Sequence, residues 1–295
     1  MEQKLTFALF GNSFQISKSA HAADIVRTIT RRGGRVVVDR PFYDFLASEG
    51  SLPTDIAGTF DGDRFEADYA VSIGGDGTFL KAAMRVGRKL TPLIGINVGR
   101  LGFLAGVLPG DIEAAFDDIF AHRYTIEEHT AIALTTDGPA DIACPYALND
   151  IAVLKRDVAS MISIRTSING EYLATYQADG LIVCTPTGST AYSLSNGGPI
   201  IVPQTGTLCL TPVAPHSLNT RPIIVADDSE VALTVTSRSH NFLVAIDGRS
   251  VTLPDGVGVS IRKAPFTTRI IKRGNQTYFS SLREKMMWGA DKRRA

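Results

Sequence analysis

The feature that most constrains this chain is a change of hydrophobic pattern near residue 124. Before that point, short apolar runs alternate with stretches of helical periodicity, which is typical of a parallel sheet covered by helices. After it, helical periodicity almost vanishes, and alternating β-branched runs bounded by Gly, Pro and Asn take over. We therefore predict an α/β domain with an open, mostly parallel sheet over residues 1–124, followed by a β-sandwich-like domain over residues 125–270.

The same patterns predict the individual elements. In the first domain we expect strands at 5–10, 35–38, 69–73 and 93–96 and helices at 19–32, 79–88 and 111–121, with Ser19 as the N-cap of the first helix. In the second domain we expect strands at 181–185, 223–225, 231–236, 241–246 and 257–262. The pair Asn169-Gly170, favoured in two-residue hairpin loops, separates alternating runs at 162–168 and 172–176 and predicts a β-hairpin.

Residues 271–295 form a C-terminal tail that could pack back on the first domain. Its last part, from Arg283 onward, holds five bases and two acids. Such a run of charge could bind phosphate, but a solvated terminus is the interpretation that we favour.

Charge and cysteine content exclude several classes of protein. Thirty Lys and Arg residues balance thirty Asp and Glu residues, and we expect no nucleic-acid partner, because such binding needs many neutralised phosphates. The three cysteines are spaced neither as a CxxC pair nor as a zinc knuckle, and the five histidines form no HExxH pattern. The first residues lack a secretory apolar region, and no apolar stretch is long enough to span a membrane. We expect a cytoplasmic protein with no membrane partner.

The sharpest local signal is the glycine turn Gly74-Gly75-Asp76-Gly77-Thr78, between an expected strand and an expected helix. Three glycines in four positions remove side chains where a ligand must come close, and the helix N-terminus offers unpaired N–H groups. This pattern favours a phosphate-binding site. A carboxylate at Asp76 would repel that ligand unless it binds a metal or takes a proton from the nucleophile, so the turn indicates phosphoryl transfer.

The turn has other interpretations. It could be a tight turn with no ligand, and it matches neither GxxxxGK[ST] nor GxGxxG. The surrounding charge changes sign at the turn: residues 49–76 hold seven acids and one base, whereas residues 81–100 hold five bases and no acid. A second glycine turn contains Arg100, which is as well suited to a structural ion pair as to a ligand.

These motifs resemble those of the NAD kinase family. The resemblance rests on the glycine turn, on the run NVGRLGFL at 97–104, and above all on DGLIVCTPTGSTAYSLSNGGP at 179–199. The run LTPVAPHSLNTRP at 210–222 is similar as well. Lipid kinases of the diacylglycerol kinase type share a GGDGT turn, but we do not associate the long second-domain motif with them.

The resemblance implies an enzyme that transfers the γ-phosphoryl group of ATP to the adenosine-ribose 2′-hydroxyl of NAD and forms NADP. It also implies a divalent metal, with Mg²⁺ expected, and a homodimer or homotetramer. A lipid kinase and a non-enzymatic NAD(P) sensor stay open as alternatives.

The resemblance further implies roles for particular residues. Asp76 would be the proton acceptor, with Gly74, Gly75, Gly77 and Thr78 around the nucleotide. Asn149 and Asp150, where relatives often have Glu at the second position, would bind NAD, and Asp179 would contact its nicotinamide end. The remaining expected NAD contacts are Thr190, Ala191, Tyr192 and Ser195, together with Ser160 and Arg249, which align only loosely. Asn196 replaces an Ala that is commoner in the family.

Overall fold

The computed structural model describes residues 4–11, 20–99, 102–138, 142–157, 160–274 and 277–289. The chain forms two compact units, residues 1–128 with 268–295 and residues 129–267. Strands β6 (Thr125–Thr136) and β17 (Gly258–Lys272) carry the chain from one unit to the other. Ser19 and Arg100, both singled out in the sequence, lie outside the described residues.

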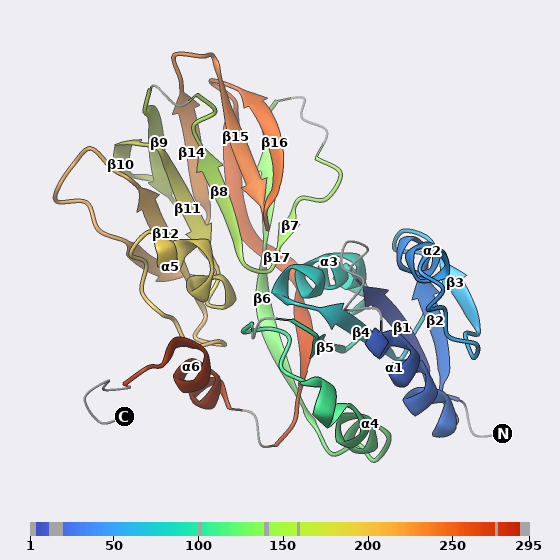
Figure 1. The fold of residues 1–295 in the computed structure, drawn as a ribbon. Coiled ribbons are helices and arrows are strands. Elements are labelled where there is room, and N and C mark those ends of the chain that lie inside the picture. Colours follow the sequence, from blue (N-terminus) through green and yellow to red (C-terminus); the bar gives the residue numbers. More distant parts are fainter. Residues whose placement is uncertain are drawn as a thin grey trace. The chain divides into compact units, whose positions relative to one another are not determined.

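The first unit contains a parallel sheet (Figure 1). Its strands lie in the order β3 (Gly58–Phe60), β2 (Arg35–Asp39), β1 (Thr6–Gly11), β4 (Tyr69–Gly74) and β5 (Leu93–Asn97), and the end of β17 continues it beside β5. Its helices are α1 (Ala20–Arg31), α2 (Arg40–Ser48), α3 (Asp76–Val86), α4 (Ile112–Phe120) and α6 (Tyr278–Met286). Short 3-10 turns, η2 (Gly87–Lys89) and η3 (Pro109–Asp111), follow α3 and precede α4.

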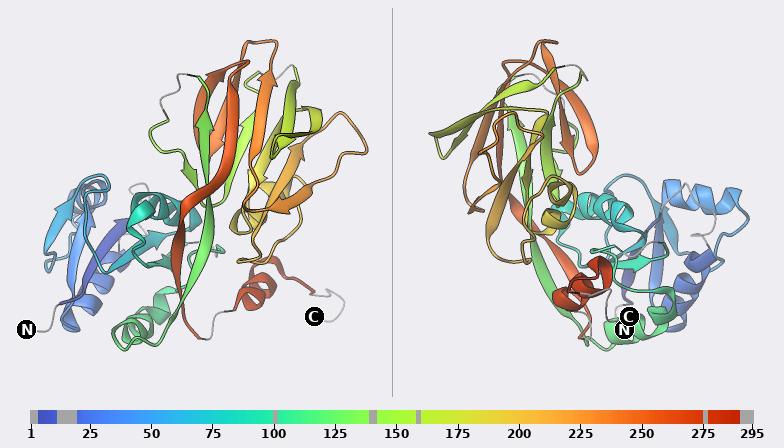
Figure 2. Two further views of the ribbon diagram at one scale, coloured as in Figure 1. Left: turned by 180° about the vertical axis from the view of Figure 1, so that it is seen from behind. Right: turned by 60° about the vertical axis from the view of Figure 1, so that its left-hand side comes forward.

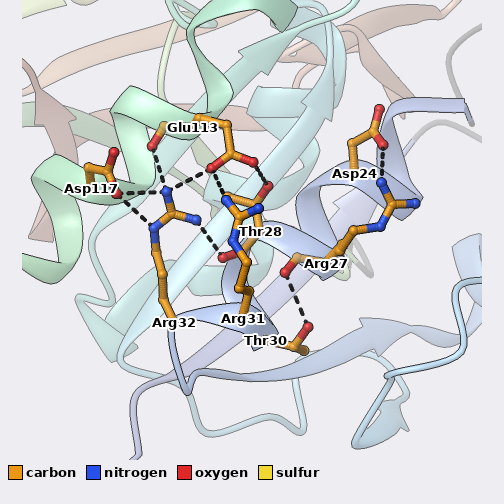
Figure 3. A network of polar contacts seen from close by, with 8 residues as sticks. All are labelled: Asp24, Arg27, Thr28, Thr30, Arg31, Arg32, Glu113 and Asp117. Atoms are coloured by element: carbon orange, nitrogen blue, oxygen red, sulfur yellow. Dashed lines mark hydrogen bonds and ion pairs between the residues drawn. The ribbon is translucent and has the colours of Figure 1, made fainter.

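Successive side chains of each strand point to opposite faces of this sheet. Apolar side chains therefore lie on both faces, and helices cover both. Ile94 and Ile96 of β5 join the apolar cluster of α1 and α4, whereas Gly95 between them faces Phe79 of α3. A polar network also joins α1 to α4 (Figure 3). In it, Arg32 bonds Glu113 and Asp117 at 2.7 and 2.6 Å.

The second unit packs two antiparallel sheets in two layers (Figure 2). One holds β10 (Glu171–Ala178), β9 (Ile162–Ile168), β14 (Val231–Thr236) and β17, with β6 and β7 (Tyr146–Ala147). The other holds β13 (Ile223–Ala226), β12 (Thr207–Val213), β11 (Gly180–Cys184), β8 (Asp150–Leu154), β15 (Asn241–Ile246) and β16 (Arg249–Pro254). Buried residues of both sheets form one core, so the predicted α/β plus β-sandwich fold class is confirmed.

The hairpin prediction is confirmed as well. Strands β9 and β10 pair from Ile168 and Glu171 onward. Asn169 and Gly170 both take positive φ, at 51° and 83°, as the favoured two-residue turn requires.

The C-terminal tail contains a helix that the sequence analysis does not predict. Residues Tyr278–Met286 form α6, which starts with a capping box at Thr277 and buries Leu282. Lys285 is half-buried, and Arg283 and Glu284 are exposed. Residues 290–295 lie outside the described part. No helix in the described part of the chain has the length and apolar character needed to cross a membrane.

Candidate phosphate and dinucleotide sites

In the first unit, the glycine turn joins β4 directly to α3. Gly75 is the N-cap of α3, and its carbonyl accepts the first hydrogen bonds of the helix from the N–H groups of Thr78 and Phe79. The N–H groups of Asp76 and Gly77 precede these bonds and lie at the positive end of the helix dipole. The local fold thus forms the kind of N-terminus that binds anions.

The three glycines of the turn have different roles. A Cβ at Gly74 would lie 2.3 Å from Thr78 Oγ1, so Gly74 is required by packing. A Cβ at Gly75 or Gly77 would meet no atom within 4 Å. Open space therefore lies above these two positions, where a ligand can approach the backbone.

Asp76 turns its carboxylate toward the loop that follows β5. It accepts N–H bonds from Phe103 (2.6 Å), Leu104 (3.0 Å) and Ala105 (3.1 Å). A Cβ at Gly102 would lie 2.1 Å from Asp76 Oδ1, so only glycine lets this loop come so close. Three of about four lone-pair positions on the carboxylate are occupied, and the N–H donors stabilise its negative charge.

The bases that follow the turn in sequence are partly bound elsewhere. Arg85 pairs with Asp39 at 2.9 Å and donates to the carbonyl of Gly62. Lys89 lies over the ring of Phe65, with Nζ 5.4 Å from its centroid. One base of the C-terminal tail, Lys285 of α6, lies instead over the ring of Phe103, with Nζ 5.1 Å from the centroid.

In the second unit, the Asn149–Asp150 segment packs against the motif that follows β11. The N–H of Thr185 donates to the carbonyl of Asn149 at 2.9 Å, and Thr185 Oγ1 donates to the carbonyl of Leu148 at 2.5 Å. A Cβ at Gly188 would lie 2.1 Å from the carbonyl oxygen of Asn149. Asn149 Oδ1 is buried and has no hydrogen-bond partner in the described structure. Such an orphaned acceptor is suited to a hydroxyl or amide donor on a ligand.

Asp247 holds this segment from the other side. Its carboxylate accepts the N–H groups of Leu148 (2.8 Å), Asn149 (2.9 Å) and Asp150 (3.1 Å). Burial raises the pKa of Asp247 despite these donors. Burial and the charge of Asp247 raise the pKa of Asp150 to about 7, so about half of the Asp150 carboxyls are protonated near pH 7, and that form can donate a hydrogen bond.

The rest of the motif forms two short helical turns, η4 (Thr187–Thr190) and α5 (Tyr192–Ser195). Thr187 Oγ1 and Nδ1 of the buried His129 share a hydrogen bond of 2.8 Å. This bond fixes η4 on β6. Ala191 is half-buried, whereas Tyr192 and Ser195 are exposed. The amide of Asn196 donates to the carbonyl of Tyr192 at 2.9 Å, so this departure from the family adds a bond at the end of α5.

Two predicted residues lie at the far end of β11 from this cluster. Asp179 precedes the strand and pairs with Lys155 Nζ at 2.7 Å. Ser160 precedes β9 and lines a hollow of about 400 Å³ beside Gln177 and Arg238. Because β11 spans five residues, its length of about 16 Å separates these residues from Asn149.

Arg249 follows the turn after β15, and its guanidinium donates to two backbone carbonyls. Nη1 bonds the carbonyl of Cys144 at 3.2 Å, and Nη2 bonds that of Tyr146 at 2.8 Å. These bonds hold the segment leading into β7. They use two of the five N–H donors, so Nε and one N–H on each of Nη1 and Nη2 remain for a ligand.

The sequence prediction missed Asp247, and it assigned no individual role to Gly102 of the run at 97–104 or to Lys285 of the basic tail. Asp247-Gly248 is a hairpin pair with positive φ at both residues, 46° and 78°, and the Asp-Gly signal between two alternating runs could have drawn attention to it. Gly102 acts through a contact distant in sequence. No local signal distinguishes Lys285 from the other bases of the tail.

Family models match both parts of the chain. The ATP-NAD kinase N-terminal domain matches residues 8–124, and the ATP-NAD kinase C-terminal domain matches residues 148–273. A curated NAD kinase of Bacteroides fragilis is 54% identical over 98% of this chain and 100% of its own length. That of Porphyromonas gingivalis is 40% identical over 96% of this chain and 98% of its own length.

Solved structures show the same fold. Yeast NADH kinase complexed with NADH superposes with a TM-score of 0.88 at 20% identity, over 99% of this chain and 89% of the yeast chain. An NAD kinase from Archaeoglobus fulgidus in complex with ATP has a TM-score of 0.77 at 26% identity, over 96% of this chain and 99% of the archaeal one.

Proposed function

The chain belongs to the NAD kinase family, and from this premise we propose how its residues carry out the reaction of the family. The enzyme transfers the γ-phosphoryl group of ATP to NAD and releases NADP and ADP. The acceptor is the 2′-hydroxyl of the adenosine ribose. The observation that carries the assignment furthest is the Asn149 amide oxygen, buried and unpartnered within the motif that resembles the NAD site.

The glycine turn of the first unit holds the phosphates of ATP. Support comes from the open space above Gly75 and Gly77 and from the free N–H groups at the start of α3. The archaeal relative was solved with ATP. Thr78 stays in contact with Gly74 and keeps the turn closed on itself.

NAD is held by the second unit. Asn149 Oδ1 accepts a donor from the dinucleotide, and protonated Asp150 donates to one of its oxygens. Thr190, Ala191, Tyr192 and Ser195 shape the surface beside the base, for which the exposed Tyr192 ring offers a stacking face. Asp247 positions the Asn149 segment without touching the ligand.

Asp76 is the proton acceptor in this proposal. One lone pair of its carboxylate remains beyond the three N–H bonds, and it accepts the proton of the 2′-hydroxyl as the phosphoryl group transfers. Orientation of the two substrates and neutralisation of charge lower most of the barrier, because the transferring group needs little covalent help.

Mg²⁺ fits this arrangement as a companion of ATP rather than as a resident of the protein. The described residues contain no group of three His, Cys, Asp or Glu side chains that could hold a metal. Phosphate oxygens and water are ligands that Mg²⁺ prefers. Bound in this way, it would neutralise charge on the β- and γ-phosphates.

We also propose a homo-oligomer in the cytoplasm. The expected NAD contacts fall at two ends of β11, and in a homodimer or homotetramer the two groups can come from different subunits. Cys144, Cys184 and Cys209 are free thiols, which suits a reducing compartment.

An assay of the purified full-length chain tests the proposed reaction. Incubation with ATP, Mg²⁺ and NAD should yield NADP, detected by an NADP-specific dehydrogenase and by mass. Omitting ATP or chelating Mg²⁺ should abolish the product. Saturable NAD binding without NADP would contradict the enzyme assignment and leave a binding protein.

A further inference from the structure

Helix α6 brings a lysine to the glycine turn from the far end of the sequence. The capping box at Thr277 starts the helix, and Leu282 buries its inner face. One turn later, Lys285 lies over the Phe103 ring. The N–H of the same Phe103 donates to Asp76, so Lys285 and the carboxylate flank one residue.

The ammonium of Lys285 has an unusual environment. It is half-buried, and no described carboxylate oxygen lies within ion-pair distance of it. The charged groups around it are Asp76 of α3, Lys272 of β17 and Glu284 of its own helix, and burial lowers its pKa to about 8. Burying a cation without a close counterion is costly, so a purely structural role would leave that cost only partly offset.

The available structural roles are weak. Contact with a phenylalanine face contributes little at a partly exposed site. A cation in the last turn of α6 also interacts favourably with the helix dipole, but so would one on the exposed face. Neither contact requires an unpaired cation beside Asp76.

We propose that Lys285 contacts the substrate, donating a hydrogen bond to a phosphate oxygen of the ATP held at the Gly74–Thr78 turn. This inference rests on the proposed position of ATP. A lysine is a compact cation with three donors and a flexible stem, which suits phosphate as a point charge. It forms no covalent bond in the reaction, and ADP leaves with its phosphates still neutralised by the same ammonium.

Because only the charged form binds phosphate, the proposal predicts a dependence on pH. The pKa of Lys285 lies below the ordinary 10.5, so the ammonium loses its proton as the pH rises through about 8. Affinity for ATP should therefore fall above pH 8 in the wild type. Lys285→Arg, which keeps its charge across this range, should abolish that fall.

Steady-state kinetics of Lys285→Met, Lys285→Arg and Arg283→Met test the proposal. Lys285→Met keeps the apolar stem and should lower kcat/KM for ATP by about 10- to 100-fold, the usual effect of a charged hydrogen bond. The KM for NAD should stay within about twofold, since the loss concerns ATP contacts. Lys285→Arg should recover most of the loss. Arg283→Met removes the same charge from the exposed face of the same helix and should change neither parameter.

Gly75→Ala separates this inference from the proposed ATP position. A methyl group there meets no protein atom but fills the space given to phosphate, so it should raise the KM for ATP. If Gly75→Ala raises it and Lys285→Met does not, the role of Lys285 is wrong and the ATP site stands. If neither does, the ATP position itself is wrong. If Lys285→Met lowers the melting temperature and weakens ATP and NAD use equally, Lys285 is structural and the inference is overturned.

Discussion

Asp76 has two roles, one in holding a loop and one in the proposed proton transfer. Its Oδ1 accepts the N–H groups of Leu104 and Ala105, and its Oδ2 accepts that of Phe103. The carboxylate therefore fixes the loop after β5 in addition to its proposed chemistry. A substitution that removes the charge also alters this loop.

For Asp76→Asn we expect turnover to fall by about 10²- to 10⁴-fold, the usual contribution of a positioned base. Asparagine can keep one oxygen toward Leu104 and Ala105, but its amide N–H₂ then faces the N–H of Phe103. That mismatch should cost about 1 to 2 kcal/mol of stability. The affinity for NAD should be unchanged. Stopped-time assays, thermal unfolding and NAD calorimetry measure turnover, stability and NAD affinity. Unchanged turnover with unchanged NAD affinity would remove Asp76 from the mechanism.

Asp150 should make stability depend on pH. Its pKa is raised from the ordinary 3.8 to about 7 by burial and by Asp247. A raised carboxyl pKa means that folding favours the protonated form, so this contribution is complete below pH 4 and is lost as the pH rises through 7. Asp150→Asn cannot ionise. Relative to the wild type, it should gain roughly 2 to 4 kcal/mol of stability between pH 5 and pH 8.

Thermal or urea unfolding at several pH values measures this difference. Asp157→Asn, a change at an exposed carboxylate, is the matched control and should follow the wild-type curve. Parallel pH curves for Asp150→Asn and the wild type would show that Asp150 titrates normally in the folded protein.

Among the elements, the turn after β11 depends on one close approach. Gly188 lies so near Asn149 that a Cβ would be 2.1 Å from the carbonyl oxygen and 2.8 Å from the Cα. Both atoms belong to the backbone, so the strain cannot be relieved by a rotamer change. The turn and the Asn149 segment must then move apart.

Gly188→Ala should therefore weaken NAD binding by at least about tenfold, because small displacements of positioning groups are costly. It should also lower stability by about 1 to 3 kcal/mol, the usual cost of overpacking. Calorimetry and unfolding measure these effects. Gly110→Ala, at a position where a Cβ meets no atom, should alter neither. Wild-type NAD affinity in Gly188→Ala would mean that the turn does not shape the pocket.

The elements that the sequence predicted are those with a strong period or a specific turn. Strands β14 and β15 match their predicted bounds, and the Asn169-Gly170 hairpin forms. Strand β3 was missed because it has only three residues. Helix α2 and strands β6, β8, β12 and β16 were missed as well, although they are longer. Helix α6 was missed since its buried face is defined by contacts far away in sequence.

The geometry around the proposed site follows only in part from local sequence patterns. A glycine turn after a strand is a local pattern, and the structure gives it the expected free N–H groups and open space. The contacts of Asp76 with Phe103 and of Asp247 with Asn149 join segments far apart in the chain. Single-sequence periodicity carries no information about such pairs.

At the scale of the whole molecule, a net charge of zero reflects equal numbers of acids and bases, many of which pair locally. Arg32 with Glu113 and Asp117, and Lys263 with Asp227, illustrate it. Neutrality argues against a polyanion partner. A phosphate site can depend on a single half-buried lysine beside a glycine turn. One lysine changes the net charge of the whole chain by only one, so the net charge does not reveal such a site.

The proposed oligomer leads to a prediction about mixed subunits. Asn149→Ala and Asp179→Ala should each abolish NAD use, the first by removing the orphaned buried acceptor and the second by removing the Lys155-paired carboxylate. If one pocket draws these residues from two subunits, a hybrid of the two variants contains one pocket with both changes and one intact pocket. Unfolding and refolding the two inactive proteins together should then restore about a quarter of wild-type activity per dimer.

Light scattering should first show that each variant keeps the oligomeric state of the wild type. A double variant refolded with wild-type chain controls for the yield of refolding. Activity that stays near zero in the mixture, with hybrids verified by two affinity tags, would place Asn149 and Asp179 in the pocket of one subunit. In that case NAD must extend along the roughly 16 Å of β11, and Asp179 would contact the end of the dinucleotide farthest from the reacting ribose.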